Sequence, residues 1–231
     1  MYAYKASLEA IDAHSTSVMI YLLTTVVFAF LYFIIAVRMT IKQKVYVVPF
    51  IGSALFFWHD LTFVLQHDLW FNVYNHWWVK MWWYALCGTV ALELLMIWYV
   101  FRFGQQELWP NISRGAYGAL IVLGTLGIGA MWYLIKVTLK DELFFVTFTI
   151  TASFSVPFHT AILSRRQSRA GQSIIMELST IVMLLCETAA FAQLDPFFTS
   201  APYLIFVAAF VIWPLVNVYL ILQFPKLPEG V

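Results

Sequence analysis

Residues 50–68 are FIGSALFFWHDLTFVLQHD, and the rest of the chain is interpreted around this stretch. It is apolar enough to cross a membrane, yet it carries His59 and Asp60 side by side. An ionised Asp near the middle of a bilayer costs about 2.5–3.5 kcal/mol on the insertion scale. The stretch therefore predicts a membrane helix whose polar pair either carries chemistry or bonds to a neighbouring helix.

The composition places the whole chain in the same class. Of its 231 residues, 62% are hydrophobic and only 11% are charged, and the mean hydropathy is +0.82. A soluble domain is closer to half apolar and a quarter charged. The net charge of +1 gives no basic excess that would favour nucleic acid. We therefore expect a multi-pass protein of a bacterial inner membrane or an ER-type membrane, with the lipid bilayer as its main partner and its oligomeric state left open.

Seven apolar segments are long enough to cross about 30 Å of hydrocarbon as helices. They cover residues 18–37, 45–66, 82–101, 117–135, 143–163, 174–191 and 201–223. Helices are expected because a spanning segment must satisfy its own backbone hydrogen bonds. Residues 146–156 alternate hydroxyl and apolar side chains as a strand would, but one such stretch does not make a barrel. The prediction is an all-α polytopic membrane protein, a single domain over residues 1–231 with seven transmembrane helices.

Lysine and arginine set the expected orientation, because they are enriched on the inner side of a membrane. With the N-terminus outside, the inner side holds nine of them: Arg38, Lys42, Lys44, Arg102, Arg114, Arg165, Arg166, Arg169 and Lys226. The outer side holds four: Lys5, Lys80, Lys136 and Lys140. This bias predicts an N-out, C-in chain. The links after the first and fifth segments are both short and basic, which predicts two three-helix bundles joined by the glycine-rich helix 117–135.

Four ionisable side chains inside apolar segments are candidate catalytic residues: Asp60, Glu93, His59 and Glu187. By this topology they could converge on one cavity, with Glu93 near the middle and the others in the outer half. Neighbours on a helix point about 100° apart, so His59 and Asp60 cannot serve one small site symmetrically. Interhelical polar contacts contribute only about 0.6 kcal/mol on average, which favours function over pure packing for Asp60 and Glu93. For His59 and Glu187 the two interpretations stay equally open.

Burial disfavours a charged carboxyl group, so we expect either Asp60 or Glu93 to be protonated near neutral pH. A neutral acid among aromatic side chains suits two tasks. It can donate a proton to an apolar substrate, or it can carry a proton across the membrane.

A second polar level lies on the predicted inner side, with His159, Glu177 and Asn217. Ionisable groups near helix ends are tolerated easily. The favoured interpretation is that His159 and Glu177 extend to the interface or pair with Arg165 or Arg169.

Metal and retinal chemistry are disfavoured by the sequence. The chain has five histidines, without tight ligand spacing, so we expect no metal site. A retinal protein needs a Schiff-base lysine in its last span, and residues 201–223 contain none. No other cofactor motif is present, and the prediction is a protein without a cofactor.

Residues 163–173, LSRRQSRAGQS, resemble the basic turn that opens the second half of the integral membrane terpene cyclases of fungal meroterpenoid and indole-diterpene pathways. Tyr46, Pro49 and Trp58, with the aromatic run 82–103, are further marks of that resemblance. The turn after Pro157 is also similar to that of the PQ-loop and SWEET-like transporters. Two departures accompany the likeness to the cyclases: His59 follows Trp58 where they have an acid, and Asn217 is the nearest match to their last-span Asp. For the transporters, Phe158 replaces the Gln that follows the proline.

The resemblance to the cyclases implies a lyase or isomerase of terpenoid biosynthesis that protonates and cyclises an apolar, isoprenoid-type small molecule. In that hypothesis Asp60, with Glu93, is the proton donor, and His59 orients or reprotonates it. Four aromatic side chains would stabilise carbocations and bind substrate: Trp58, Phe56, Phe57 and Trp83. Asn217 is a further predicted substrate-binding residue. The alternative is a small-molecule or proton-coupled transporter, in which Pro157 and Asn217 hinge or line the path. A non-catalytic membrane subunit is the third hypothesis.

Overall fold

The computed structural model describes residues 2–225, and every regular element in this part of the chain is a helix. The elements are α1 (Tyr4–Ala13), α2 (Ser15–Gln43), α3 (Phe50–Leu65), η1 (Leu69–Tyr74), α4 (Trp77–Phe103), α5 (Gln105–Leu108), α6 (Arg114–Leu139), α7 (Phe145–Arg166), α8 (Ile174–Phe191), η2 (Pro196–Thr199) and α9 (Ala201–Gln223). The all-α prediction is confirmed over this range, including residues 146–156, which lie inside α7. Lys226, counted on the predicted inner side, lies outside the described residues.

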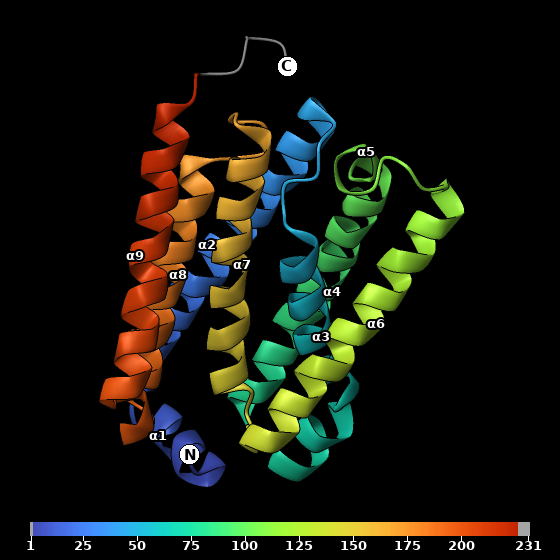
Figure 1. Ribbon diagram of the computed structural model, residues 1–231. Helices are drawn as coiled ribbons and strands as arrows, with labels where there is room; N and C mark the ends of the chain where they lie inside the picture. Colours follow the sequence, from blue (N-terminus) through green and yellow to red (C-terminus); the bar gives the residue numbers. More distant parts are fainter. Residues whose placement is uncertain (1, 226–231) are drawn as a thin grey trace.

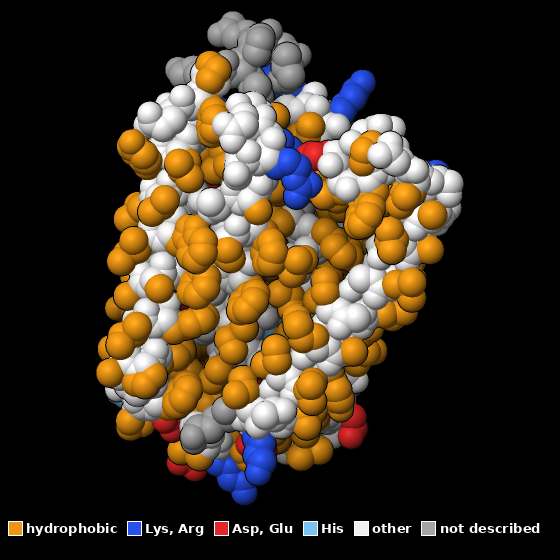
Figure 2. Space-filling model, in the orientation of Figure 1, with side chains coloured by type: hydrophobic (Ala, Val, Ile, Leu, Met, Phe, Trp, Pro, Cys, Tyr) orange, Lys and Arg blue, Asp and Glu red, His pale blue; other side chains and the backbone are white. Residues whose placement is uncertain are grey.

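Among the described residues, six helices are long and apolar enough to cross a membrane: α2, α4, α6, α7, α8 and α9. Figure 2 shows the matching surface, with a hydrophobic band between charged side chains at the two ends of the visible face. The chain is thus built as a multi-pass membrane protein.

The predicted second segment, 45–66, forms the shorter helix α3, of 16 residues. Pro49 is the cap of this helix, with φ −58° and ψ 143°. A proline pushes the residue before it out of the helical region, so the helix cannot extend back toward residue 45. Residues 44–49 therefore form the connection between α2 and α3.

The helices do not pack as two separate three-helix bundles. The most extensive contact of α2 is with α8, while α3 packs chiefly against α4 and also against α6 and α7 (Figure 1). The buried side chains of α2 explain this arrangement because they form a single stripe along one face of the helix: Val18, Leu22, Thr25, Tyr32, Phe33, Ala36 and Thr40. Such a stripe fits one neighbour closely. The first and second halves of the chain therefore interlock.

The glycine-rich helix α6 lies at the edge of the bundle (Figure 1), and not between two bundles as predicted. Two of its glycines let large side chains of α3 approach. A Cβ added to Gly124 would come 3.1 Å from Cζ of Phe50, and one added to Gly129 would come 2.5 Å from Nε1 of Trp58. Gly127, in contrast, has no neighbouring atom within 4 Å of such a Cβ. Gly124 and Gly129 therefore mark two points where large side chains of α3 pack closely on α6.

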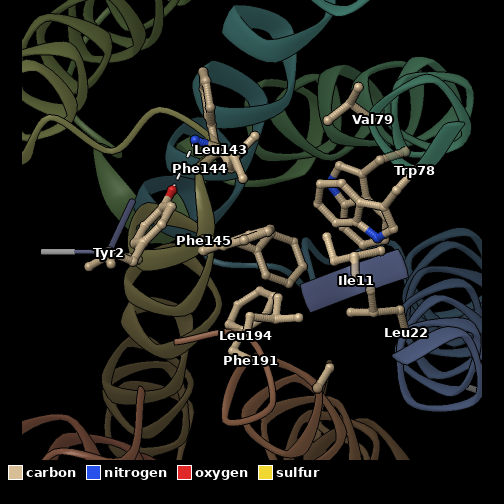
Figure 3. Close-up of a cluster of buried hydrophobic side chains, with 14 of the residues drawn as sticks. Tyr2, Ile11, Leu22, Trp78, Val79, Leu143, Phe144, Phe145, Phe191 and Leu194 are labelled. Atoms are coloured by element: carbon tan, nitrogen blue, oxygen red, sulfur yellow. Dashed lines mark hydrogen bonds between the residues drawn. The ribbon is translucent and has the colours of Figure 1, made fainter. Parts of the chain in front are cut away.

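A large hydrophobic cluster closes the bundle at the end where α1 lies (Figure 3). Ile11 of α1 is fully buried there, together with Trp78, Phe145 and Phe191. These aromatic side chains come from α4, α7 and α8, so α1 ties the ends of three helices together.

Tyr2 and Asp141 form a buried polar clamp beside this cluster. The Tyr2 hydroxyl donates to Oδ1 of Asp141 (2.5 Å) and accepts from the backbone N–H of Leu143 (2.9 Å; Figure 3). Oδ2 of Asp141 accepts from the backbone N–H of Thr147 (2.6 Å) and from its hydroxyl (2.7 Å). Burial, and then the charge of Asp141, raise the pKa of Tyr2 above its ordinary value, so Tyr2 stays a donor. The clamp joins the N-terminal segment to the start of α7.

Replacing Asp141 by alanine is expected to destabilise the protein by about 1–3 kcal/mol, because it leaves buried donors without an acceptor. Thermal unfolding in detergent should show a lower Tm. The matched control is Glu142→Ala, since the neighbouring Glu142 is exposed. Equal Tm values for the two variants would contradict the role given to the clamp.

Candidate functional site

A narrow pocket lies at the centre of the bundle, between α2, α3, α4, α7 and α8. Its cavity volume is about 60 Å³, so the space between the lining side chains is narrow. Its aromatic lining consists of Phe30, Tyr32, Phe33, Phe56, Trp82 and Phe148. Its polar lining consists of Thr25, Asp60, Thr89, Glu93, Ser155 and Thr180. The shape suits a slim apolar molecule that meets polar groups at a few defined points.

Two carboxyl groups meet in the wall of this pocket. Asp60 on α3 and Glu93 on α4 are 2% and 1% exposed, and both line the pocket. Two carboxyl groups buried in one apolar space cannot both be ionised without a large cost, so one of them is expected to carry a proton. Oε2 of Glu93 is buried and has no partner among the described residues. The pair is therefore a buried proton store beside an apolar space.

The local sequence brings these groups together. Trp82, Leu86, Thr89 and Glu93 follow one another at steps of four, three and four residues, so they share one face of α4. All four line the pocket. The Thr89 hydroxyl donates to Oδ2 of Asp60, which joins this face to α3.

His59 supports the acid pair from outside the pocket. Its ring is fully buried, packs against Trp132, Phe144 and Phe148, and does not line the cavity. Its Nδ1 nevertheless lies 2.6 Å from Oδ1 of Asp60. The helical angle between the two residues separates their surroundings, as predicted, but their side chains still bond to each other. His59 can thus hold the orientation of Asp60 and exchange a proton with it.

Glu187 lies apart from the other candidate acids. It is fully buried on α8, where its Oε1 accepts from the Thr149 hydroxyl, and that hydroxyl lies 3.0 Å from the Tyr203 hydroxyl. Neither Glu187 nor these two partners line the central pocket. The structure thus brings Asp60, Glu93 and His59 together but not Glu187.

Among the predicted substrate-binding aromatic residues, only Phe56 lines the pocket. Trp58 points toward α6, where its indole N–H donates to the carbonyl of Thr125 (2.6 Å). Phe57 packs in the cluster around Val100 and Tyr117. The Trp83 indole donates to the carbonyl of Val64 (2.9 Å). Three of the four therefore hold helices together.

Apart from Phe56, the aromatic side chains that face the pocket were not predicted from the sequence. Trp82 could have been identified from its spacing to Thr89 and Glu93 on α4. Phe148 of α7 and Phe30 and Phe33 of α2 carry no such signal, because their position depends on how α2 and α7 pack.

The predicted pairing of His159 and Glu177 with arginines is wrong. Nδ1 of His159 lies 2.9 Å from Oε1 of Glu177, and Nε2 of His159 lies 2.9 Å from the Tyr32 hydroxyl. The Asn217 amide donates to the other Glu177 oxygen (3.1 Å). All four side chains are buried, from 0% to 7% exposed. Asn217, predicted to bind substrate, belongs to this group and does not line the pocket.

The arginines at the end of α7 and in the turn after it have other partners. Arg166 donates from Nε and Nη2 to Oε2 of Glu107 (2.9 and 2.8 Å), and Nη1 of Arg165 lies 3.6 Å from Oε1 of Glu107. Arg169 donates to the carbonyl of Phe224 (2.6 Å). Because α5 places Glu107 beside the end of α7, Arg165 and Arg166 pair with Glu107 and not with Glu177.

Comparison of the chain with protein-family models, with curated proteins and with solved structures found no match.

Proposed function

We propose that this protein is a membrane-embedded enzyme that protonates an isoprenoid-type chain and so starts its cyclisation. The observation that carries the proposal is the pair of buried acids, Asp60 and Glu93, in the wall of a narrow, aromatic-lined pocket. The turn at residues 163–173, similar to that of the membrane terpene cyclases, points to the same substrate class.

The first chemical step needs only groups of this site. The protonated carboxyl of the pair gives its proton to one carbon of a double bond, so that a C–H bond forms and the neighbouring carbon becomes a cation. The new carboxylate is stabilised by the Thr89 hydroxyl and by His59. The faces of Trp82, Phe56 and the other lining rings stabilise the cation while the chain closes into a ring. Loss of a proton then gives a product that is an isomer of the substrate.

The open side of the pocket fits an apolar substrate. Four of its half-exposed lining residues come from α2 and α4: Val26, Ala29, Phe30 and Ala85. These two helices share few contacts with each other. We propose that the substrate enters from the bilayer between them.

We also propose that α3 is a seventh crossing and that the chain is N-out and C-in. In support, α1 and the end of α9 lie at opposite ends of the bundle (Figure 1), which requires an odd number of crossings. A helix of 16 residues is about 24 Å long, and the flanking connection and η1 provide the remaining depth. The excess of lysine and arginine on one side supports the direction.

The test is to incubate the purified protein in lipid nanodiscs with plain and epoxidised prenyl compounds in D₂O. We expect a cyclic isomer that carries one deuterium from the acid pair, identified by mass spectrometry and NMR. Recovery of every compound unchanged, with a correctly folded protein, would reject the proposed activity.

A proton-coupled carrier is the second candidate. The observation that favours it is Tyr32, which lines the pocket and also bonds to His159, so that polar groups continue from the pocket toward the C-terminal end of α2. Uptake of a small molecule into proteoliposomes, driven by a proton gradient and without a change in its mass, would support this candidate over the enzyme.

A further inference from the structure

A second set of titratable side chains reaches the same pocket as the acid pair. Tyr32 lines the cavity together with Asp60 and Glu93, and its hydroxyl bonds to His159, which in turn bonds to Glu177. These groups come from α2, α7 and α8. The start of the proposed reaction does not use them.

Hydrogen bonds continue from Glu177 to side chains of α7 and α9. These contacts determine which group donates and which accepts in each bond. The Trp213 indole N–H can only donate, and it donates to the Thr160 hydroxyl (2.8 Å). Thr160 then donates to Oδ1 of Asn217 (2.6 Å), so the Asn217 amide N–H₂ faces Oε2 of Glu177 (3.1 Å).

The donors and acceptors between Glu177 and the pocket follow from this arrangement. An ionised Glu177 only accepts, so Nδ1 of His159 carries the proton that lies between them, and Nε2 is left as an acceptor. The Tyr32 hydroxyl therefore donates to Nε2 of His159. Its oxygen lone pairs stay free to receive a proton.

We propose that Tyr32 and His159 are the proton acceptor that ends the cyclisation, an inference that rests on the proposed function. Tyr32 is the catalytic residue because it lines the pocket. Glu177 and Asn217 are positioning residues, which act by fixing the tautomer of His159.

The step balances in protons and electrons. The Tyr32 oxygen takes a proton from a carbon next to the cation while the Tyr32 hydroxyl proton passes to Nε2 of His159. The electrons of the broken C–H bond form the new C=C bond. The acid pair has lost one proton and His159 has gained one, and return of this proton through water in the emptied pocket resets the site.

The experiment compares Tyr32→Phe with the wild-type protein, because this change removes one hydroxyl and keeps the ring in the wall. We expect the normal cyclic alkene to form about 100-fold more slowly, while substrate is consumed less than about tenfold more slowly, in line with the usual contribution of one proton-transfer group. The missing product should appear as other alkene isomers or as alcohols from water addition to the cation. His159→Asn should shift the products in the same direction.

The matched control is Tyr203→Phe, a buried tyrosine whose hydroxyl contacts Thr149 away from the pocket. It should keep the wild-type product ratio, and the Tm values of all variants are measured alongside. An unchanged product ratio in Tyr32→Phe, or an equal change in Tyr203→Phe, would overturn the inference and leave the proposed function standing. A wild-type protein that converts no prenyl compound would reject both.

Discussion

Replacing Asp60 by asparagine is expected to lower product formation by a factor of about 10²–10⁴, the range typical for loss of a general acid. Asparagine keeps the size of the side chain and can still bond to Thr89, but it cannot share a proton with Glu93. Glu93→Gln should have a similar effect, because it removes the other half of the pair. The measurement is the rate of cyclic product formation by each variant at equal protein concentration in nanodiscs.

Glu187→Gln is the matched control for this experiment. Glu187 is buried as completely as Asp60, yet it lies in the Thr149 contact outside the pocket. Its amide variant should keep a rate close to that of the wild-type protein. If Asp60→Asn also keeps the wild-type rate, the acid pair is not the proton donor. If Glu187→Gln abolishes activity as well, burial of the acids, and not their place in the pocket, explains the losses.

The second large effect concerns stability and comes from one methyl group on α6. Gly129→Ala places a Cβ 2.5 Å from Nε1 of Trp58, whose indole is held by its bond to the Thr125 carbonyl. The ring cannot move away without losing that bond. Overpacking of this kind costs about 1–3 kcal/mol. Unfolding of the variant in detergent should therefore begin at a clearly lower temperature than that of the wild-type protein.

Gly127→Ala provides the comparison on the same helix. An added Cβ at Gly127 meets no atom within 4 Å, and the change from glycine to alanine is the same at both positions. We expect this variant to be as stable as the wild-type protein or slightly more stable, because alanine favours the helix. Equal losses at the two positions would mean that backbone freedom, and not contact with Trp58, sets the cost.

The sequence predicts the class of fold because one physical constraint dominates it. Long apolar segments in a bilayer must be helices, and six of the seven predicted segments are helices of sufficient length and hydropathy. The exception follows from a local cause, since Pro49 shortens the helix that carries Asp60. How the helices pair depends on side-chain contacts between distant segments. No local signal in α2 identifies α8 as its neighbour, although the two helices share the most extensive contact of the bundle.

The candidate site, too, could be predicted from the sequence only in part. Asp60 and Glu93 could be predicted because burying an acid in an apolar segment is costly, which indicates a specific role. The structure places both residues in one pocket. The bond between His59 and Asp60 could not be predicted from helical angles alone, because a long side chain can reach back toward its neighbour. The chain from Trp213 to Tyr32 joins residues of four helices, so no spacing in the sequence indicates it.

The docking of α2 on α8 has a consequence for how the protein is made. The ribosome releases α2 well before α8, so the wall that α2 gives to the pocket can close only when α8 has also entered the membrane. Contacts between segments so far apart in the sequence form late and slowly. A nascent chain that still lacks α8 therefore holds Asp60 and Glu93 without the complete cavity, and reactivity begins only when α8 is in place.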